Sequence, residues 1–212
     1  MNAKWIGLGC LGVLVLFFVV VGLSLVGSYN GLVGKDQAVQ TAWAQVQNVY
    51  LRRADLVPNL VATVQGAASF EKSTLTEVTE ARAKVGQVTL AAGGVPNQAQ
   101  LSQFQQAQGG LGGALSRLLV VAERYPELKA TQNFRDLQAQ LEGTENRIAV
   151  ARQDFNNAAQ VYNTSIRTFP AVLYAGLFGF HDRPYFAAQA GADTAPKVNF
   201  DLNPKSPAPA QP

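Results

Sequence analysis

The chain has 212 residues, a formal net charge of +3 at pH 7, one cysteine and one histidine. These counts exclude a disulfide within the chain and a di-iron site built from paired Glu-x-x-His motifs, and we predict no cofactor. Basic and acidic residues nearly balance, 17 against 14. Because the basic residues form no cluster interleaved with aromatics, we predict no nucleic-acid partner.

Residues 5–27 form an uninterrupted run of uncharged, mostly apolar residues. At ~1.5 Å per residue a helix of this length spans about 35 Å, enough to cross the hydrocarbon core of a bilayer. A cleaved signal peptide is the alternative, but its apolar region has only about 7 to 15 residues and ends at a small-residue cleavage site. We therefore predict an uncleaved transmembrane anchor, with the lipid bilayer as a partner, and interpret Cys10 as a lipid-facing residue.

The charges that flank this run bear on its orientation. Lys4 precedes it, whereas Lys35 beyond it is offset by the neighbouring Asp36. The positive-inside rule then favours a cytoplasmic N-terminus and an extracytoplasmic remainder. We divide the chain into an anchor (1–28), one helical domain (29–187) and a proline-rich tail (188–212) that we predict to be disordered.

Apolar residues recur at alternating spacings of three and four along most of the domain, which is typical of the seam of a helical bundle or coiled coil. The pattern is clearest from Phe134 to Phe169. Gly93 to Asn97 read as a loop, and Gly109 to Gly113 either permit close helix approach or fray the helix that holds them. The pattern predicts helical segments at about 29–54, 57–89, 98–124 and 127–168.

A change of phase in the seam falls near Pro58, where a proline removes one helical hydrogen bond. We predict that Arg53, Asp55 and Pro58 set a bend between the first two segments. Asp55 as an N-cap would give a sharp break, and Pro58 alone would give a kink. The sequence leaves both possibilities open.

Five charged residues stand at or beside core-type positions of the seams. Arg53, Glu71 and Arg82 occupy such positions, and Glu145 and Arg152 lie one residue beside the last seam. A charge buried in a bundle needs a partner, so these residues could form an internal network that fixes register. Alternatively, their long side chains reach water at the edge of the seam.

The run from Ala171 to Phe180 is apolar and aromatic but too short to cross a bilayer. It either caps the open end of the bundle, which we favour, or dips into the membrane surface. The aromatics between Phe169 and Phe186 cannot all enter a regular seam, so we predict a contact surface there that includes Phe178 and Phe180.

The sequence contains these motifs: YNGLV (29–33), Trp43, RRADLVPNLV (52–61, which includes Asn59), EAR (80–82), YPEL (125–128), TENRI (144–148), AR (151–152), YNT (162–164) and FP (169–170). Together they resemble the bacterial LemA family, over about residues 5–186. The resemblance implies a bacterial membrane protein with one N-terminal transmembrane helix and a soluble antiparallel four-helix bundle. It implies an association with membrane stress and membrane proteases, but no established activity.

No Gly-x-Ser-x-Gly elbow, P-loop or Cys/His cluster occurs in the sequence, so we predict neither catalytic nor metal-binding residues. The first hypothesis is a membrane-anchored bundle that binds or scaffolds a protein partner in the membrane. The alternative is an extracytoplasmic sensor that binds a small ligand within the bundle. Homo-oligomerisation stays open.

Overall fold

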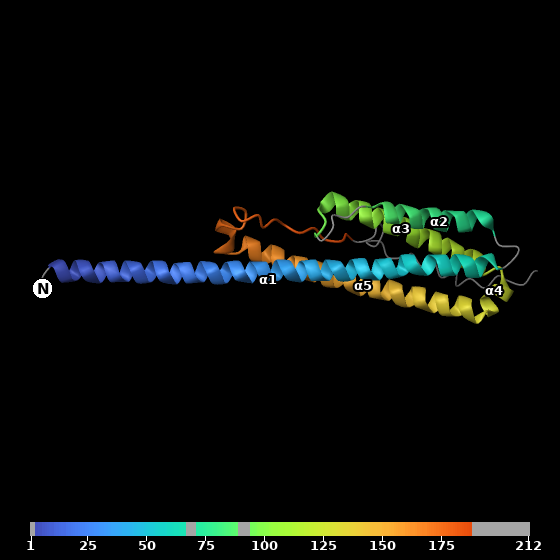
Figure 1. The fold of residues 1–212 in the computed structure, drawn as a ribbon, viewed down its shortest axis with the longest axis horizontal. Helices are drawn as coiled ribbons and strands as arrows, with labels where there is room; N and C mark the ends of the chain where they lie inside the picture. The colour runs from blue at the N-terminus through green and yellow to red at the C-terminus, as the bar shows by residue number, and fades with distance from the viewer. Residues whose placement is uncertain (1–2, 67–70, 89–93, 188–212) are drawn as a thin grey trace, which may run out of the picture.

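The computed structural model describes residues 3–66, 71–88 and 94–187, with side chains from residue 11 onward. Most of these residues are helical and none lies in a strand, which confirms the predicted all-α bundle (Figure 1). The elements are α1 (Ala3–Gln65), α2 (Lys72–Gln87), α3 (Gln98–Ala122), α4 (Pro126–Ala130), α5 (Gln132–Arg167) and the short 3₁₀ helix η1 (Ala171–Leu173).

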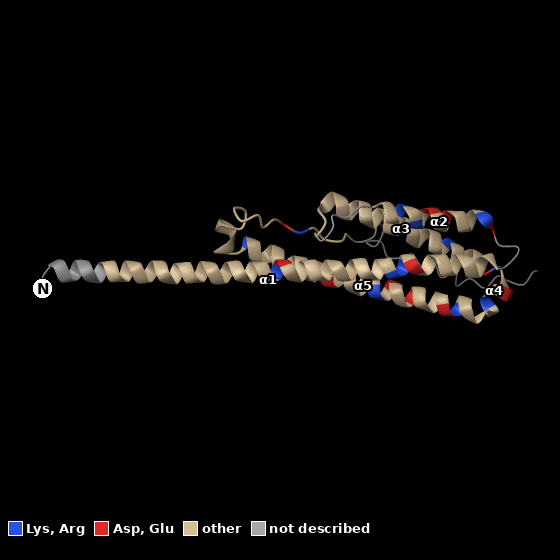
Figure 2. Ribbon diagram, in the orientation of Figure 1, with Lys and Arg blue, Asp and Glu red and all other residues tan. Residues whose placement is uncertain are grey.

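Helix α1 has 63 residues, about 95 Å of helix, and joins the anchor to the bundle without a break. Its N-terminal part projects alone from the bundle (Figure 1). Among the residues of α1 whose side chains are described, Lys35 is the first charged one (Figure 2). It is the one helix of the described chain that is long and apolar enough to cross a membrane. The apolar run and the bundle therefore share a single continuous helix.

The bundle consists of two antiparallel helix pairs, α1 with α5 and α2 with α3. Lys35 of α1 donates a hydrogen bond of 2.6 Å to Ser165 near the end of α5. At the opposite end of the bundle, Glu71 just before α2 pairs with Arg124 just after α3. The short helix α4 connects the second pair to α5 at this end (Figure 1).

The first predicted helix boundary is wrong, because α1 continues through Pro58 to Gln65. The next described helix begins at Lys72, so the chain reverses between these two residues and not at Pro58. Asp55 lies within α1 and cannot be an N-cap. The supposed phase change vanishes when Tyr50 is included in the seam, since buried positions then follow one another at regular spacings of three and four: Val39, Trp43, Val46, Tyr50, Arg53, Val57, Leu60 and Val64.

The third predicted segment is one helix in the structure, whereas the fourth is divided into two helices. Helix α3 begins one residue after Asn97, whose side chain accepts from the Gln100 N–H while the Gln100 side chain accepts from the Asn97 N–H. This capping box fixes the predicted start, and the helix continues through the glycines from Gly109 to Gly113. The segment 127–168 is instead divided at Thr131, which caps α5 by accepting from the Phe134 N–H.

The core has two apolar clusters, arranged along the bundle. The membrane-proximal cluster contains Trp43, Phe104, Phe155, Tyr162 and Phe186, among others, and is built by α1, α3, α5 and the segment from η1 onward. The distal cluster is built by α1, α2, α3, α4 and α5. Helix α2 therefore covers only the distal half, and the C-terminal segment takes part in covering the other half.

Candidate functional site

A layer of polar side chains separates the two apolar clusters. It is formed by Arg53 of α1, Gln108 of α3 and Glu145 of α5, and we call these three residues the polar layer. Each follows a residue of one cluster and precedes a residue of the other along its helix. Three helices thus meet at one level through hydrogen bonds instead of apolar packing.

Arg53 is the centre of the polar layer, and its side chain is only 5% exposed. Its Nη1 donates a hydrogen bond of 2.8 Å to Oε1 of Glu145, while Nη2 donates to the backbone and side-chain oxygens of Gln108. Its guanidinium also lies over the ring of Tyr50, 5.0 Å from the ring centre. Glu145 is 51% exposed, so one end of the ion pair faces water and keeps the desolvation cost of the carboxylate low.

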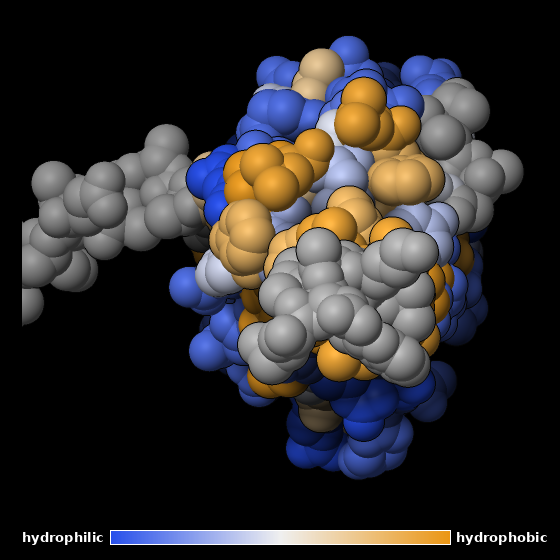
Figure 3. Space-filling model, turned by 90° about the vertical axis from the view of Figure 1, so that its left-hand side faces the viewer, coloured by the Kyte–Doolittle hydropathy of each residue, from blue (hydrophilic) through white to orange (hydrophobic). Residues whose placement is uncertain are grey.

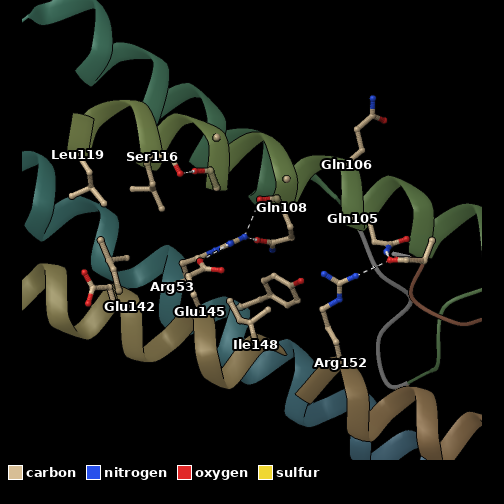
Figure 4. Close-up of a pocket in the computed structure, with 17 residues that line it drawn as sticks. Arg53, Gln105, Gln106, Gln108, Ser116, Leu119, Glu142, Glu145, Ile148 and Arg152 are labelled. Atoms are coloured by element: carbon tan, nitrogen blue, oxygen red, sulfur yellow. Dashed lines mark hydrogen bonds and ion pairs between the residues drawn. The ribbon is translucent and has the colours of Figure 1, made fainter. Parts of the chain in front are cut away.

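A groove of about 660 Å³ opens beside the polar layer, between α1, α3 and α5 (Figure 4). Arg53 lies at its base, directed toward Gln108 and Glu145. The wall on α3 includes Gly109, Gly112 and Gly113. A Cβ atom placed on Gly109 or Gly113 would meet nothing within 4 Å, so the missing side chains leave space that the groove occupies.

Arg152 is a half-buried residue of α5 that lies farther along the groove and reaches across toward α3 (Figure 4). Its Nη2 donates a hydrogen bond of 2.9 Å to the backbone oxygen of Ala187, and its guanidinium lies 4.9 Å from the ring centre of Phe186. Arg152 thus binds the C-terminal segment rather than a carboxylate. It limits the groove at its membrane-proximal end.

The remaining predicted charged residues lie outside the polar layer. Glu71 is exposed and lies 3.3 Å from Arg124 in an ion pair. Arg82 is also exposed, and its Nε donates a hydrogen bond of 3.1 Å to the backbone oxygen of Ala54. The structure therefore places Arg53 and Glu145 in one internal network and leaves Glu71 and Arg82 at the surface.

Three further candidates, Asp55, Pro58 and Asn59, are exposed on the outer face of α1. Pro58 has no N–H to donate to the carbonyl of Ala54, four residues earlier. That carbonyl is the acceptor that Arg82 reaches from α2. Pro58 is therefore accommodated by a contact between helices.

The C-terminal segment is held along α5 by two asparagines that the sequence reasoning did not single out. The side chain of Asn163 donates to the Arg183 carbonyl and accepts from its N–H, both at 2.8 Å. Asn156 makes the same pair of contacts with the Phe186 backbone. Arg183 in turn binds Asp36 of α1 at 2.6 Å. The YNT motif, which contains Asn163, was the available signal.

The aromatic residues after α5 pack beside the point where α1 leaves the bundle. The Tyr29 ring contacts Phe178 and Phe180 edge-on, with centre distances of 5.3 and 5.6 Å. Phe180 packs against the membrane-proximal cluster, whereas Phe178 is largely exposed. The two predicted contact residues thus lie together but face different surroundings.

Two tyrosines of the membrane-proximal cluster have perturbed acidities. Burial raises the pKa of Tyr50, and the positive charges of Arg152 and Arg53 partly oppose this effect. Burial also raises the pKa of Tyr162, and the positive charge of Arg183 partly opposes this effect.

Within the described residues, no three His, Cys, Asp or Glu side chains converge on a metal-sized site.

One exposed apolar helix that continues into a helical bundle defines the class of a membrane-associated bundle protein. The chain belongs to the LemA family, whose profile matches residues 42–200. Neither the family description nor the names of the relatives below denote an enzymatic activity.

Three relatives illustrate the similarity. The magnetosome protein MamQ 2 of Paramagnetospirillum magneticum is 28% identical over 190 residues, which cover 81% of this chain and 69% of that protein. The magnetosome protein MamQ of Magnetospirillum gryphiswaldense is 27% identical over 213 residues, covering 92% and 78%. Protein LemA of Metamycoplasma hominis is 24% identical over 144 residues, covering 68% and 62%.

Proposed function

We propose that this protein is a non-enzymatic scaffold, anchored in the membrane by α1, that holds a segment of a protein partner in the groove. The observation that carries the proposal is the glycine wall of the groove. Gly109, Gly112 and Gly113 line it from within a helix, where each glycine costs roughly 0.5–1 kcal/mol relative to alanine. What these glycines provide is close access of another backbone to α3.

The state of Arg53 favours a protein partner over a small anionic ligand. Its two Nη atoms already donate to Gln108 and Glu145, so its charge is compensated within the bundle. The groove is also lined by the half-buried Leu119 and by the buried Leu115 and Ile148, beside these polar groups. This mixture of apolar and polar surface suits a peptide segment.

A ligand-binding sensor is the second candidate. The volume of about 660 Å³ falls within the range of ~300–1,000 Å³ found for small-molecule sites. However, the interior of the bundle at this level is occupied by the polar layer. A ligand would therefore bind beside the bundle and not within it.

The membrane location narrows the class of partner. The family resemblance points to membrane-protease and stress systems, so we propose a partner in the same membrane.

The balance of flanking charges favours an extracytoplasmic bundle. A reporter fused after residue 187 would test this side: alkaline phosphatase should be active there, and an active cytoplasmic reporter would contradict it.

Site-specific photo-crosslinking tests the scaffold proposal. A photoreactive phenylalanine replaces Ser116, which is exposed and lines the groove, and for comparison Val150, which is exposed on α5 away from the groove. In native bacterial membranes we expect a discrete protein adduct from position 116 that position 150 does not give. Identical patterns from both positions, or no protein adduct at 116, would contradict the proposal.

A further inference from the structure

Large apolar side chains are exposed at the end of the bundle where α1 leaves it. Leu177 is 86% exposed and Phe169 is 76% exposed. In the view along α1 from its N-terminal end, apolar residues gather on this end of the bundle (Figure 3). We call this surface the membrane-proximal face, formed by Phe169, Val172, Leu173, Leu177 and Phe178.

The position of this face along α1 is given by Tyr29. The ring of Tyr29 contacts Phe178, and Tyr29 lies two residues beyond the end of the apolar run at residue 27. Aromatic side chains in membrane proteins concentrate at this level, where hydrocarbon meets headgroups. In Figure 1 the segment that carries the face is the described part of the bundle nearest to the N-terminal half of α1.

The segment has an inner and an outer side. Ala171 and Ala175 are buried in the membrane-proximal cluster, and Phe180 packs against it. These inner residues cap the bundle, as the sequence favoured. The apolar side chains of the membrane-proximal face come from the same turns and stay between 53% and 86% exposed in the described structure.

The part of the chain that would enter lipid carries no charged residue. No Asp, Glu, Lys or Arg occurs from Thr168 to Phe180. The first charged residues on either side, Arg167 and Asp182, pair with each other at 2.5 Å. The two ends of the segment are therefore joined by an ion pair that has no net charge. Contact of the face with lipid would desolvate no unpaired side-chain charge.

We propose that the membrane-proximal face inserts into the surface of the same bilayer that α1 crosses. The aromatic and aliphatic side chains would occupy the boundary between headgroups and acyl chains, as those of interfacial amphipathic segments do. The anchor holds the face at this boundary, so insertion requires no separate association step. The bundle then has two attachments to the membrane and a restricted tilt. This inference does not depend on the proposed partner in the groove.

Depth measurements by electron paramagnetic resonance test the proposal on the full chain. Cys10→Ala removes the one cysteine, and Leu177→Cys carries a spin label in nanodiscs of phosphatidylcholine and phosphatidylglycerol. Val120→Cys, exposed on α3 in the distal half, is the matched control. Phe169→Cys provides a second position on the face, and circular dichroism verifies that each variant is folded.

We expect the label at 177 to collide readily with oxygen but several-fold less with an aqueous nickel chelate than the label at 120. Position 169 should behave in the same way. Equal chelate access at 177 and 120 would place the face in water and overturn the proposal. Protection at 177 from both oxygen and chelate would also overturn it, because the face would then be covered by protein, including a second copy of this chain.

Discussion

Arg82 on α2 donates a hydrogen bond of 3.1 Å from Nε to the backbone carbonyl of Ala54 on α1. In an uninterrupted helix the N–H four residues later would bind this carbonyl, but that residue is Pro58. The cost of the missing helical bond is therefore offset by a donor from another helix. The same contact fixes α2 against α1 after the chain reverses.

This relationship predicts that Arg82 and Pro58 are energetically coupled. Arg82→Ala should lower the free energy of unfolding by about 1 kcal/mol, the net contribution of a typical hydrogen bond. In a Pro58→Ala background the cost should be smaller, because the substituted residue then has an N–H that can bind the Ala54 carbonyl. Urea unfolding of the four proteins measures the coupling, with Lys84→Ala on α2 as a control. An equal cost of Arg82→Ala in both backgrounds would show that the two residues are independent.

The polar layer predicts an asymmetry between its two charged members. Glu145→Ala leaves the buried charge of Arg53 without its carboxylate and should cost about 2 kcal/mol, less than for a fully buried pair because Glu145 faces water. Arg53→Met leaves Glu145 solvated and should cost about 1 kcal/mol, mainly through the unsatisfied Gln108 amide.

The double variant Arg53→Met with Glu145→Ala should accordingly be more stable than Glu145→Ala alone. Chemical denaturation of the three variants provides the comparison. If removing Arg53 costs more than removing Glu145, then packing of the arginine, rather than its charge, dominates the layer.

The raised pKa of Tyr50 predicts that the folded protein loses stability at alkaline pH. Burial raises its pKa in the folded state above the ordinary value of 10.0, so the folded state favours the neutral phenol. The resulting stabilisation is complete below pH 10 and is lost as the pH rises through the folded pKa. Tyr50→Phe cannot ionise at this position, so its stability should decline less steeply above pH 10 than that of the unaltered chain. Parallel curves of unfolding free energy against pH for the two proteins would contradict the raised pKa of Tyr50. Tyr162 remains in both proteins and does not affect the comparison.

Local signals were sufficient for much of the fold. The apolar run predicted the projecting part of α1, and Asn97 with Gln100 marks the start of α3 because a capping box involves only neighbouring residues. Pro58 misled the prediction because its compensating donor, Arg82, is distant in the sequence. Thr131 was missed because no glycine or proline between residues 127 and 133 marks a break there.

The candidate site was only partly accessible from the sequence. Arg53 was identifiable as a charge at a seam position, but its choice of Glu145 depends on the register of α1 against α5. Gln108 also occupies a seam position, and its polarity there was the signal for the third member of the polar layer. Asn156 contacts a segment without helical periodicity, so no local pattern reveals its role.

The most direct test of the scaffold account is to fill the groove without weakening the bundle. The double variant Gly109→Leu with Gly113→Leu places side chains where a Cβ meets nothing within 4 Å, and leucine favours helix over glycine by roughly 0.5–1 kcal/mol. Gly143→Leu, at a similarly open site on α5 outside the groove, is the control. Each variant is combined with the photoreactive residue at position 116. We predict that the filled variant unfolds no more easily than the unaltered chain yet loses the protein adduct, whereas the control retains it. An undiminished adduct in the filled, stably folded variant would contradict the account.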